Sequence, residues 1–228
     1  MGKALFVTGT GTDVGKTYVT GLIVKKLQDA GLDAGYYKAA LSGAEPDGRG
    51  HLIPGDAAWV KQAAGLPDPL EDLVTYVYQE AVSPHLAARH TGVPVELERI
   101  RTDFARAGAG HEYLTMEGSG GILCPLRWDA RQHLLLEDMI RELGLGCVIV
   151  ADAGLGTINS TVLTVEYLRH RDIPVRGIFF NHWRPGDPMQ EDNRAMVEQL
   201  TKVPVLACIR KNNAELNIKI EKLKELYQ

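Results

Sequence analysis

Lys16 and Thr17 are the residues whose types and positions indicate chemistry most directly. They close a glycine-punctuated stretch that follows the apolar run Leu5-Phe6-Val7 and precedes a helical pattern: Gly9-Thr10-Gly11-Thr12-Asp13-Val14-Gly15-Lys16-Thr17. A loop of this kind turns its backbone N–H groups onto an anion, and the helix N-terminus adds positive potential. Lys16 can then reach the β- and γ-phosphates of a nucleotide, and the Thr17 hydroxyl can bind Mg²⁺. These residues predict a phosphate-binding P-loop, and an ordinary glycine-rich turn is the weaker interpretation.

The loop departs from the common pattern G-x-x-x-x-G-K-[ST] in its length. The first glycine of that pattern would fall at position 10, which is Thr10, and the nearest upstream glycine is Gly9. The predicted P-loop is therefore one residue longer than the common one.

Strand-like and helix-like segments alternate along the chain, as in α/β proteins. Runs such as Val148-Ile149-Val150 are apolar throughout, which favours strands buried on both faces of a parallel sheet. The expected strands are Ala4–Thr8, Ala34–Lys38, Tyr113–Glu117, Cys147–Ala151, Val175–Asn181 and Val205–Ile209. The expected helices are Lys16–Ala30, Asp56–Ala64, Pro84–His90, Val95–Ala107, His133–Leu143, Ile158–Arg171, Gln190–Leu200 and Ala214–Leu226. We therefore predict one α/β domain over residues 1–228, with a three-layer, mostly parallel β-sheet, helices on both faces and a P-loop NTPase type of fold.

Further candidate residues lie where ligands bind in this class of fold, at the carboxyl ends of strands. Glu117 ends an expected strand and could hold Mg²⁺; the glycine-rich turn Gly118–Gly121 after it is either a ligand-binding backbone or a flexible turn. Lys38 also ends a strand and could neutralise a transferring phosphate, although a solvated lysine is the usual outcome. Asp56 opens a helical pattern, where an N-cap is the simplest role. The segment Leu41–Pro54 is expected to be a loop.

Composition excludes several classes of protein. The net charge of −4 gives no basic footprint for nucleic acid, and no apolar run is long enough to cross a bilayer. Met1-Gly2-Lys3 leads directly into the first expected strand, which leaves no room for a signal peptide. The three cysteines have no C-x-x-C spacing, so buried thiols in a reducing cytoplasm are expected.

These residues, in this order, resemble dethiobiotin synthetase, an enzyme of biotin biosynthesis. The resemblance runs from Phe6 to about Asn181, and the family's loop has the same extra residue. Its matching pieces are Val7–Thr17, Tyr37-Lys38 with Ser42-Gly43, Asp56-Ala57, Ser83-Pro84-His85, Glu117–Gly121, Leu155–Asn159 and Asn181. The resemblance implies a cytoplasmic, homodimeric, ATP- and Mg²⁺-dependent ligase. It would close the ureido ring from 7,8-diaminopelargonic acid and CO₂, through a carbamate and a carbamic–phosphoric anhydride.

The resemblance also implies roles for individual residues. The catalytic residues would be Lys16, Lys38 and Thr12. The nucleotide-binding residues would be Gly11, Asp13, Val14, Gly15, Lys16, Thr17, Tyr18, Glu117, Gly118, Gly120 and, at adenine, Asn181. The substrate-binding residues would be Thr12, Lys38, Ser42, Gly118, Gly156, Thr157 and Asn159, the last three reaching the substrate's carboxylate from the other subunit. The metal ligands would be Thr17, Asp56 and Glu117.

One departure from the family concerns the base. Arg210-Lys211 stands where family members carry a proline-bearing turn that packs on adenine, so the sequence leaves base specificity open. A P-loop ATPase switch or partner-binding module of the partitioning type is the main alternative. The absence of an early lysine in the loop and the presence of Lys38 and Ser42 argue against it. An amidase of the cobyrinate type would need a glutaminase domain, for which this chain has no room. A nucleoside kinase would need an arginine-rich lid, which the sequence does not show.

Overall fold

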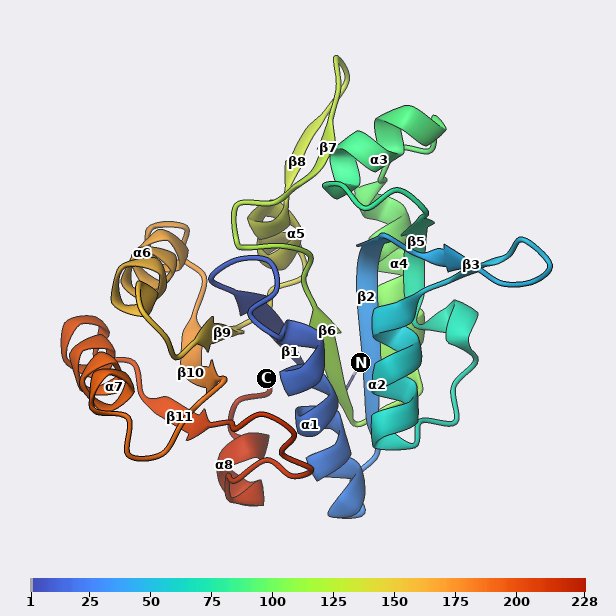
Figure 1. Ribbon diagram of the computed structural model, residues 1–228. Helices are drawn as coiled ribbons and strands as arrows, with labels where there is room; N and C mark the ends of the chain where they lie inside the picture. Colours follow the sequence, from blue (N-terminus) through green and yellow to red (C-terminus); the bar gives the residue numbers. More distant parts are fainter. Residues whose placement is uncertain (1) are drawn as a thin grey trace.

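The computed structural model describes residues 2–228, which fold around one seven-stranded sheet (Figure 1). All neighbouring strands of this sheet pair in parallel. In spatial order the strands are β11 (Val205–Cys208), β10 (Val175–Asn181), β9 (Cys147–Asp152), β1 (Lys3–Gly9), β6 (Tyr113–Glu117), β2 (Ala34–Ser42) and β5 (Val74–Tyr78). The prediction of an α/β fold with a parallel sheet is confirmed.

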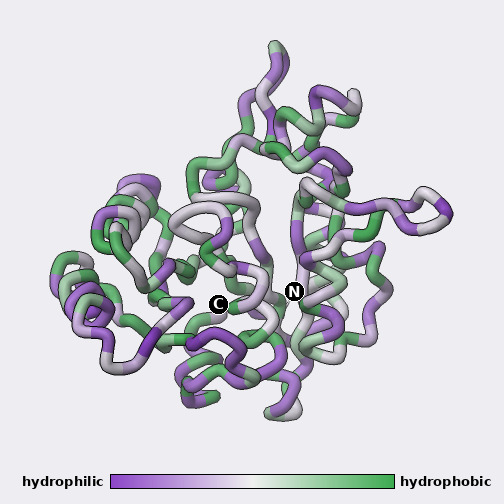
Figure 2. Tube along the Cα trace, viewed as in Figure 1, coloured by the Kyte–Doolittle hydropathy of each residue, from purple (hydrophilic) through white to green (hydrophobic). Residues whose placement is uncertain are grey.

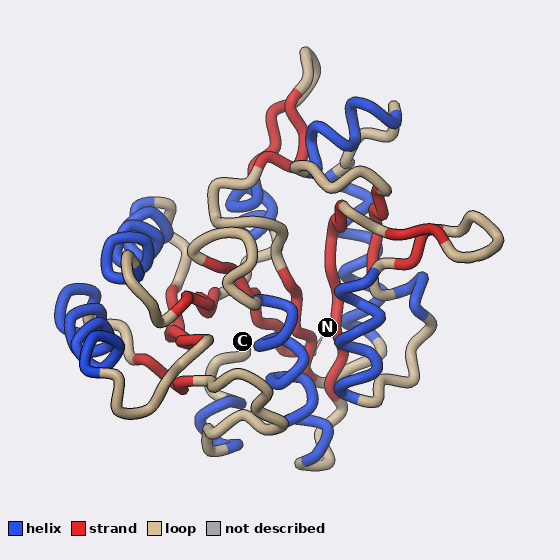
Figure 3. Tube along the Cα trace, in the orientation of Figure 1, coloured by secondary structure: helices blue, strands red, loops and turns tan. Residues whose placement is uncertain are grey.

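Helices cover both faces of the sheet, so the fold has three layers (Figures 1 and 3). One face packs against α3 (Pro84–Thr91), α4 (Leu97–Ala109), α5 (Leu136–Glu142), α6 (Thr157–His170) and α7 (Pro188–Thr201). The other face packs against α1 (Lys16–Asp29), α2 (Gly55–Ala64) and α8 (Ile220–Lys224). Strand β1 serves both layers, since Phe6 faces the first and Leu5 and Val7 face the second. Among residues 2–228, no helix has the length and apolar character needed to cross a membrane.

Strands β2 and β6 lie side by side, and their register sets the position of several polar groups. Tyr36 lies opposite Thr115, and Lys38 lies opposite Glu117. Alternate residues of a strand point to the same face, so Tyr36 and Lys38 both face the α1 and α2 layer, whereas Tyr37 belongs to the opposite core. Lys38, within β2, and Glu117, at the end of β6, are in this way directed to one place beside the P-loop.

The structure corrects several element predictions. The sequence reading missed β5, which lies at the sheet edge and whose burial alternates, so it lacks the continuous apolar run of the central strands. The expected helix His133–Leu143 is wrong at its start, because residues 133–135 form β8 (His133–Leu135), which pairs antiparallel with β7 (Pro125–Trp128). The helix α5 begins only at Leu136. A one-turn 3-10 helix, η1 (Leu70–Asp72), precedes β5.

Two further expectations fail in detail. The segment Leu41–Pro54 is not simply a loop, because β2 continues to Ser42 and β3 (Glu45–Pro46) pairs antiparallel with β4 (Leu52–Ile53). Figure 2 shows hydrophilic residues at the tip of this hairpin. The expected helix Ala214–Leu226 is reduced to α8, because the preceding residues wind across the end of α1 without helical bonding.

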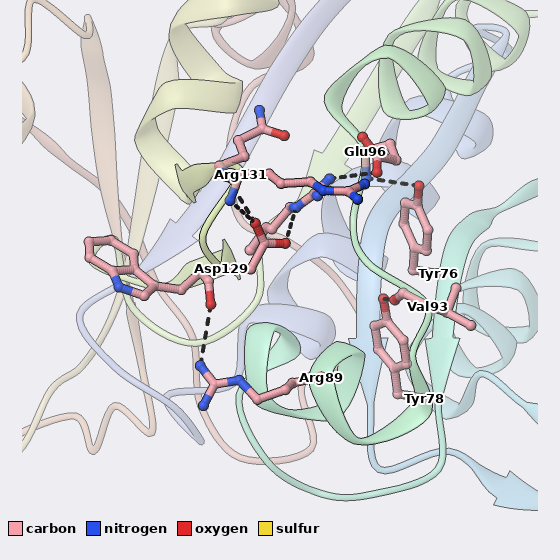
Figure 4. Close-up of polar contacts among 10 residues, drawn as sticks. Tyr76, Tyr78, Arg89, Val93, Glu96, Asp129 and Arg131 are labelled. Atoms are coloured by element: carbon pink, nitrogen blue, oxygen red, sulfur yellow. Dashed lines mark hydrogen bonds and ion pairs between the residues drawn. The ribbon is translucent and has the colours of Figure 1, made fainter.

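Polar contacts tie the β7–β8 hairpin to α3 and to the residue before α4, and Figure 4 labels Arg89, Glu96 and Asp129 among the residues involved. The Arg127 guanidinium donates to Glu96 at 2.5 Å and to Asp129 at 2.6 Å. Arg89 of α3 donates to the Trp128 carbonyl oxygen at 3.3 Å. These contacts add to the apolar packing of the hairpin, whose Leu126 and Leu134 are buried in the core.

Candidate functional site

The predicted P-loop has the backbone geometry that its glycines require. Gly15 is the N-cap of α1 with φ +88°, a left-handed conformation that favours glycine, and Asp13 also has a positive φ of 61°. A β-carbon on Gly15 would lie 2.1 Å from Nδ2 of Asn181, so only glycine fits there. The loop is anchored to the sheet, because Thr10 donates its N–H to the Val150 carbonyl at 3.0 Å.

Lys16 is buried and points back into this loop. Its ammonium group donates to the Gly11 carbonyl oxygen at 2.9 Å. Burial, and then the nearby positive charge of Lys38, lower the pKa of Lys16. An anion placed in the loop would relieve both effects, because it supplies the negative charge that the buried ammonium group lacks.

Glu117 is the centre of a polar cluster beside the P-loop. Its side chain is 1% exposed. Its Oε1 accepts hydrogen bonds from the Thr17 hydroxyl at 2.8 Å and from the Lys38 ammonium at 2.7 Å, and Lys38 also donates to Asp56 Oδ2 at 2.6 Å. The structure thus brings together three carboxylate and hydroxyl groups that are far apart in sequence.

Asp56 corrects one of the sequence interpretations. It is not the N-cap of α2, because Pro54 holds that position and no side chain caps the helix. Asp56 lies in the first helical turn instead, and its side chain contacts Lys38. Its carboxylate is therefore directed to the cluster and not to the free N–H groups of its own helix.

Lys38 carries its charge in spite of burial. Burial by itself lowers the pKa of a lysine, but the carboxylates of Glu117 and Asp56 outweigh it, and the net shift of the Lys38 pKa is upward. The interpretation of Lys38 as a solvated lysine is wrong, since the residue is 4% exposed.

The donors in this cluster match those of a magnesium site. Mg²⁺ is bound in proteins by one or two carboxylates together with hydroxyl groups, waters and substrate phosphates. Thr17, Asp56 and Glu117 supply only oxygen atoms, and they lie next to the phosphate-binding loop. Within residues 2–228, no group of three or more His, Cys, Asp or Glu side chains is arranged to hold a metal. Waters and the phosphates of a ligand would complete the shell of a metal held here.

The turn Gly118–Gly121 is packed and not a free loop. Gly118 donates its N–H to the Val7 carbonyl at 2.9 Å, and the Ser119 hydroxyl donates to the Ala40 carbonyl at 2.6 Å. A β-carbon on Gly121 would lie 3.5 Å from Cα of Gly11, so the turn runs against the P-loop. A β-carbon on Gly120 would lie 4.0 Å from the Thr12 hydroxyl. The turn and the P-loop together form one wall of the site.

Asn181 ends β10 and lies directly under the P-loop. Its Nδ2 donates to the Val14 carbonyl oxygen at 3.1 Å. Its Oδ1 is buried and accepts no hydrogen bond within the described chain. A buried amide oxygen without a donor is costly, and a ligand with an N–H group would satisfy it.

Tyr18 connects the P-loop helix to the C-terminal loop that contains Arg210 and Lys211, which the family resemblance predicts to lie near the base. Its hydroxyl donates to the Asn213 carbonyl oxygen, and its ring lies 5.5 Å from that of Trp59. Arg210 and Lys211 are exposed in this loop. The loop is therefore attached through Tyr18 at one end, without the rigidity that a proline would give.

Ser42 and the start of α6 are not drawn into the cluster. Ser42 lies four residues beyond Lys38 along β2, and its hydroxyl is buried without a hydrogen-bond partner among residues 2–228. Gly156, Thr157 and Asn159 lie at the N-terminus of α6, and within residues 2–228 no hydrogen bond joins them to the P-loop cluster. Thr157 points inward, where its hydroxyl lies 3.2 Å from that of Thr161, and Asn159 is exposed.

The sequence reading missed two side chains at this site. The hydroxyl of Tyr36 donates to Glu117 Oε2 at 3.0 Å. Spacing could have found it, because Tyr36 and Lys38 are two residues apart and share a strand face. Cys124 is buried, and burial raises the pKa of its thiol to about 11, although the charges of Lys16 and Lys38 oppose the shift. The thiol is therefore protonated at neutral pH and unreactive.

Comparisons with solved structures agree with this fold. The ParA family ATPase from Chlorobium tepidum TLS superposes with a TM-score of 0.57 at 12% identity, over 93% of this chain and 86% of that chain. The MinD protein from Pyrococcus horikoshii OT3 superposes with a TM-score of 0.56 at 14% identity, over 93% and 82%. At these identities the likeness shows the fold alone. Fold and loop together define a protein of the P-loop NTPase class.

Sequence relatives give the family. A family model described as an AAA domain matches residues 3–217. The ATP-dependent dethiobiotin synthetase BioD of Brachyspira hyodysenteriae is 46% identical over 209 residues, which cover 92% of both chains. That of Clostridium botulinum is 45% identical over 229 residues, with 100% of this chain and 99% of the relative covered. The chain belongs to the family of ATP-dependent dethiobiotin synthetases, as the sequence motifs predicted.

Proposed function

We propose that this protein, acting as one domain over residues 1–228, closes the ureido ring of dethiobiotin from 7,8-diaminopelargonic acid, CO₂ and ATP. One amine takes up CO₂ and loses a proton to form a carbamate, and a carbamate oxygen attacks the γ-phosphate of ATP and displaces ADP. The second amine then attacks the resulting carbamic–phosphoric anhydride, closes the ring and releases phosphate. The observation that carries the proposal is the buried cluster of Lys38, Glu117 and Asp56 beside the P-loop. A bare nucleotide-binding loop does not need a second buried lysine.

Lys16 and the P-loop backbone from Gly11 to Gly15 bind the phosphates in this proposal. The lowered pKa of Lys16 reflects a buried cation without a matching anion, and the β- and γ-phosphates supply one. Thr17, Asp56 and Glu117 hold Mg²⁺, which when bound neutralises charge on the phosphates. These residues do their work by position and charge, since the transfer needs no nucleophilic side chain.

Lys38 stabilises the carbamate and the transferring phosphoryl group, with Thr12 and Ser42 beside the diamine. Its ammonium group is held by two carboxylates, so it is oriented before the substrate arrives. The Ser42 hydroxyl is buried and has no hydrogen-bond partner in the described part of the chain, residues 2–228, which suits a hydroxyl that bonds an amine or a carbamate of the substrate. Gly118 and Gly120 let the turn approach both the substrate and the nucleotide closely.

Asn181 binds the adenine base. Its Nδ2 is used by the Val14 carbonyl, so Oδ1 is the free group, and it can accept a hydrogen bond from the exocyclic amine of adenine. Tyr18 contributes to the same side by holding the loop that ends at Asn213.

A homodimer completes the site. Gly156, Thr157 and Asn159 lie at the N-terminus of α6, and such a terminus suits the carboxylate of the substrate. The Leu155 side chain beside it is 92% exposed, and that of Leu163, further along α6, is 61% exposed. A second copy that covers these leucines would carry the helix N-terminus to the site of its partner.

The experiment is to incubate the purified protein with ATP, Mg²⁺, bicarbonate and 7,8-diaminopelargonic acid and to detect dethiobiotin by mass spectrometry. We expect product, and ATP hydrolysis that depends on the diamine. Hydrolysis at the same rate without diamine and bicarbonate, and no ring product, would instead support an ATPase switch of the partitioning type.

A further inference from the structure

Tyr36 is a buried tyrosine whose hydroxyl serves one carboxylate oxygen. It is 1% exposed and lies in the core beneath α1 and α2. Its hydroxyl donates to Glu117 Oε2 at 3.0 Å. The other oxygen, Oε1, faces Thr17 and Lys38. The two oxygens of Glu117 therefore have different surroundings: Oε1 is directed to the P-loop, and Oε2 is directed to the protein interior.

This arrangement fixes how Glu117 can bind a cation. A metal beside Thr17 meets Oε1, whereas Oε2 is held by a donor inside the core. Turning the carboxylate to offer both oxygens would break the Tyr36 hydrogen bond and leave a polar hydroxyl buried without a partner, which is costly. Glu117 is therefore held in a one-oxygen mode of binding.

The mode of carboxylate binding distinguishes divalent cations. Mg²⁺ prefers six ligands in a regular octahedron, with single-oxygen contacts of roughly 2.0–2.1 Å. Ca²⁺ takes six to eight ligands and often uses both oxygens of one carboxylate. A glutamate restricted to one oxygen suits the smaller ion better than the larger one.

We propose that Tyr36 is a positioning residue that makes the metal site selective for Mg²⁺ over Ca²⁺ by holding Glu117 in a one-oxygen geometry. The proposal rests on the proposed magnesium site at Thr17, Asp56 and Glu117. Tyr36 itself touches neither metal nor substrate and acts only through Glu117.

The chain offers a matched control on the same strand. Tyr37 is buried as well, but it faces the other core, where its hydroxyl lies 2.5 Å from the Thr75 hydroxyl and bonds no residue of the site. Tyr36→Phe and Tyr37→Phe each remove one buried hydroxyl and keep the ring. Both variants carry a similar structural cost, but only Tyr36→Phe frees Glu117.

The test measures the dissociation constant of ADP by isothermal titration, with saturating Mg²⁺, with saturating Ca²⁺ and with EDTA. We expect wild type to prefer Mg²⁺. In Tyr36→Phe the preference should fall on the order of fivefold, corresponding to about 1 kcal/mol, while Tyr37→Phe keeps the wild-type ratio. An unchanged ratio in Tyr36→Phe, or an equal change in Tyr37→Phe, overturns the proposal. Wild-type affinity that neither metal alters would refute the proposed metal site itself.

A second measurement serves if Tyr36→Phe does not fold. In a crystal structure of the wild-type protein with Mg²⁺ and ADP, Glu117 Oε2 should stay within about 3 Å of the Tyr36 hydroxyl. It should also lie outside the metal shell of roughly 2.0–2.1 Å. Both oxygens of Glu117 within that shell would overturn the proposal.

Discussion

The ammonium nitrogen of Lys38 lies 2.7 Å from Oε1 of Glu117, although 79 residues separate the two in sequence. They are opposite one another in the register of β2 and β6, and both are buried. A charge removed from water is stable only when a partner of opposite sign is held close to it. The pair therefore links the stability of the sheet to the chemistry at its edge.

Lys38→Met should lower the free energy of unfolding by about 3 kcal/mol, because it leaves the buried Glu117 carboxylate without its cation. The double variant Lys38→Met/Glu117→Gln should recover most of this loss. Urea unfolding followed by circular dichroism measures both. Lys25→Met removes an exposed pair with Asp29 and should cost under about 0.5 kcal/mol. A Lys38→Met variant as stable as Lys25→Met would show that the buried pair contributes nothing.

Lys16→Ala should reduce turnover at least about a hundredfold, because the ammonium group acts on phosphates as charge develops there. The fold should remain intact. The native state disfavours this charge, as the lowered pKa shows, so its removal costs little stability. Steady-state kinetics and thermal unfolding separate the two effects. Near-normal turnover in this variant would contradict the P-loop assignment.

His111 should make stability pH-dependent at the opposite end of the sheet. Its ring lies 2.7 Å from Asp33 and 3.0 Å from Asp68. Burial alone would lower the pKa of His111, but these two aspartates outweigh it and raise the pKa above 6.5. The stabilisation is therefore fully present below about pH 6.5 and is lost as the pH rises through the folded-state pKa.

The difference in unfolding free energy between wild type and His111→Gln should accordingly shrink between pH 6 and pH 8. Urea unfolding at several pH values measures it. His170→Gln, at the exposed end of α6, is the control. A difference that is constant over this range would exclude the raised pKa.

Leu155→Asp and Leu163→Asp should each weaken the proposed dimer, because a charge buried at an apolar interface is costly. Sedimentation equilibrium should show a dimer for wild type and a shift to monomer for both variants. Activity should fall in parallel with the dimer. A wild-type protein that is monomeric and fully active would contradict the proposed shared site.

Base discrimination should be modest, on the order of tenfold in favour of ATP. Asn181 gives one specific contact, but the loop at Arg210 and Lys211 lacks a proline to reduce the entropy cost of ordering it. The check is kcat/KM for ATP, GTP, CTP and UTP under the same conditions. A strict ATP requirement would show that Asn181 and the remaining contacts are sufficient.

The amino-acid sequence by itself determined the P-loop, the parallel sheet and the identity of the charged residues at its edge. These features depend on local order: Gly15-Lys16-Thr17 between a strand and a helix, and apolar runs such as Val148-Ile149-Val150. The spacing of neighbouring residues predicts the P-loop and the buried strands, because loop geometry and strand burial depend on residues close in sequence.

Only the tertiary structure decided which of these residues meet. From the sequence, the Asp56 side chain could either cap its own helix or point away from it. In the folded chain it contacts Lys38 instead of capping the helix. The role of Tyr36 depended on the β2–β6 register, which places Tyr36 opposite Thr115 and Lys38 opposite Glu117, so that the Tyr36 hydroxyl reaches Glu117 on the next strand. The edge strand β5 and both hairpins were also decided at this level, because strands of two to five residues without uniform burial carry no continuous apolar signal. Long-range pairing is a property of the packed chain, and no local pattern encodes it alone.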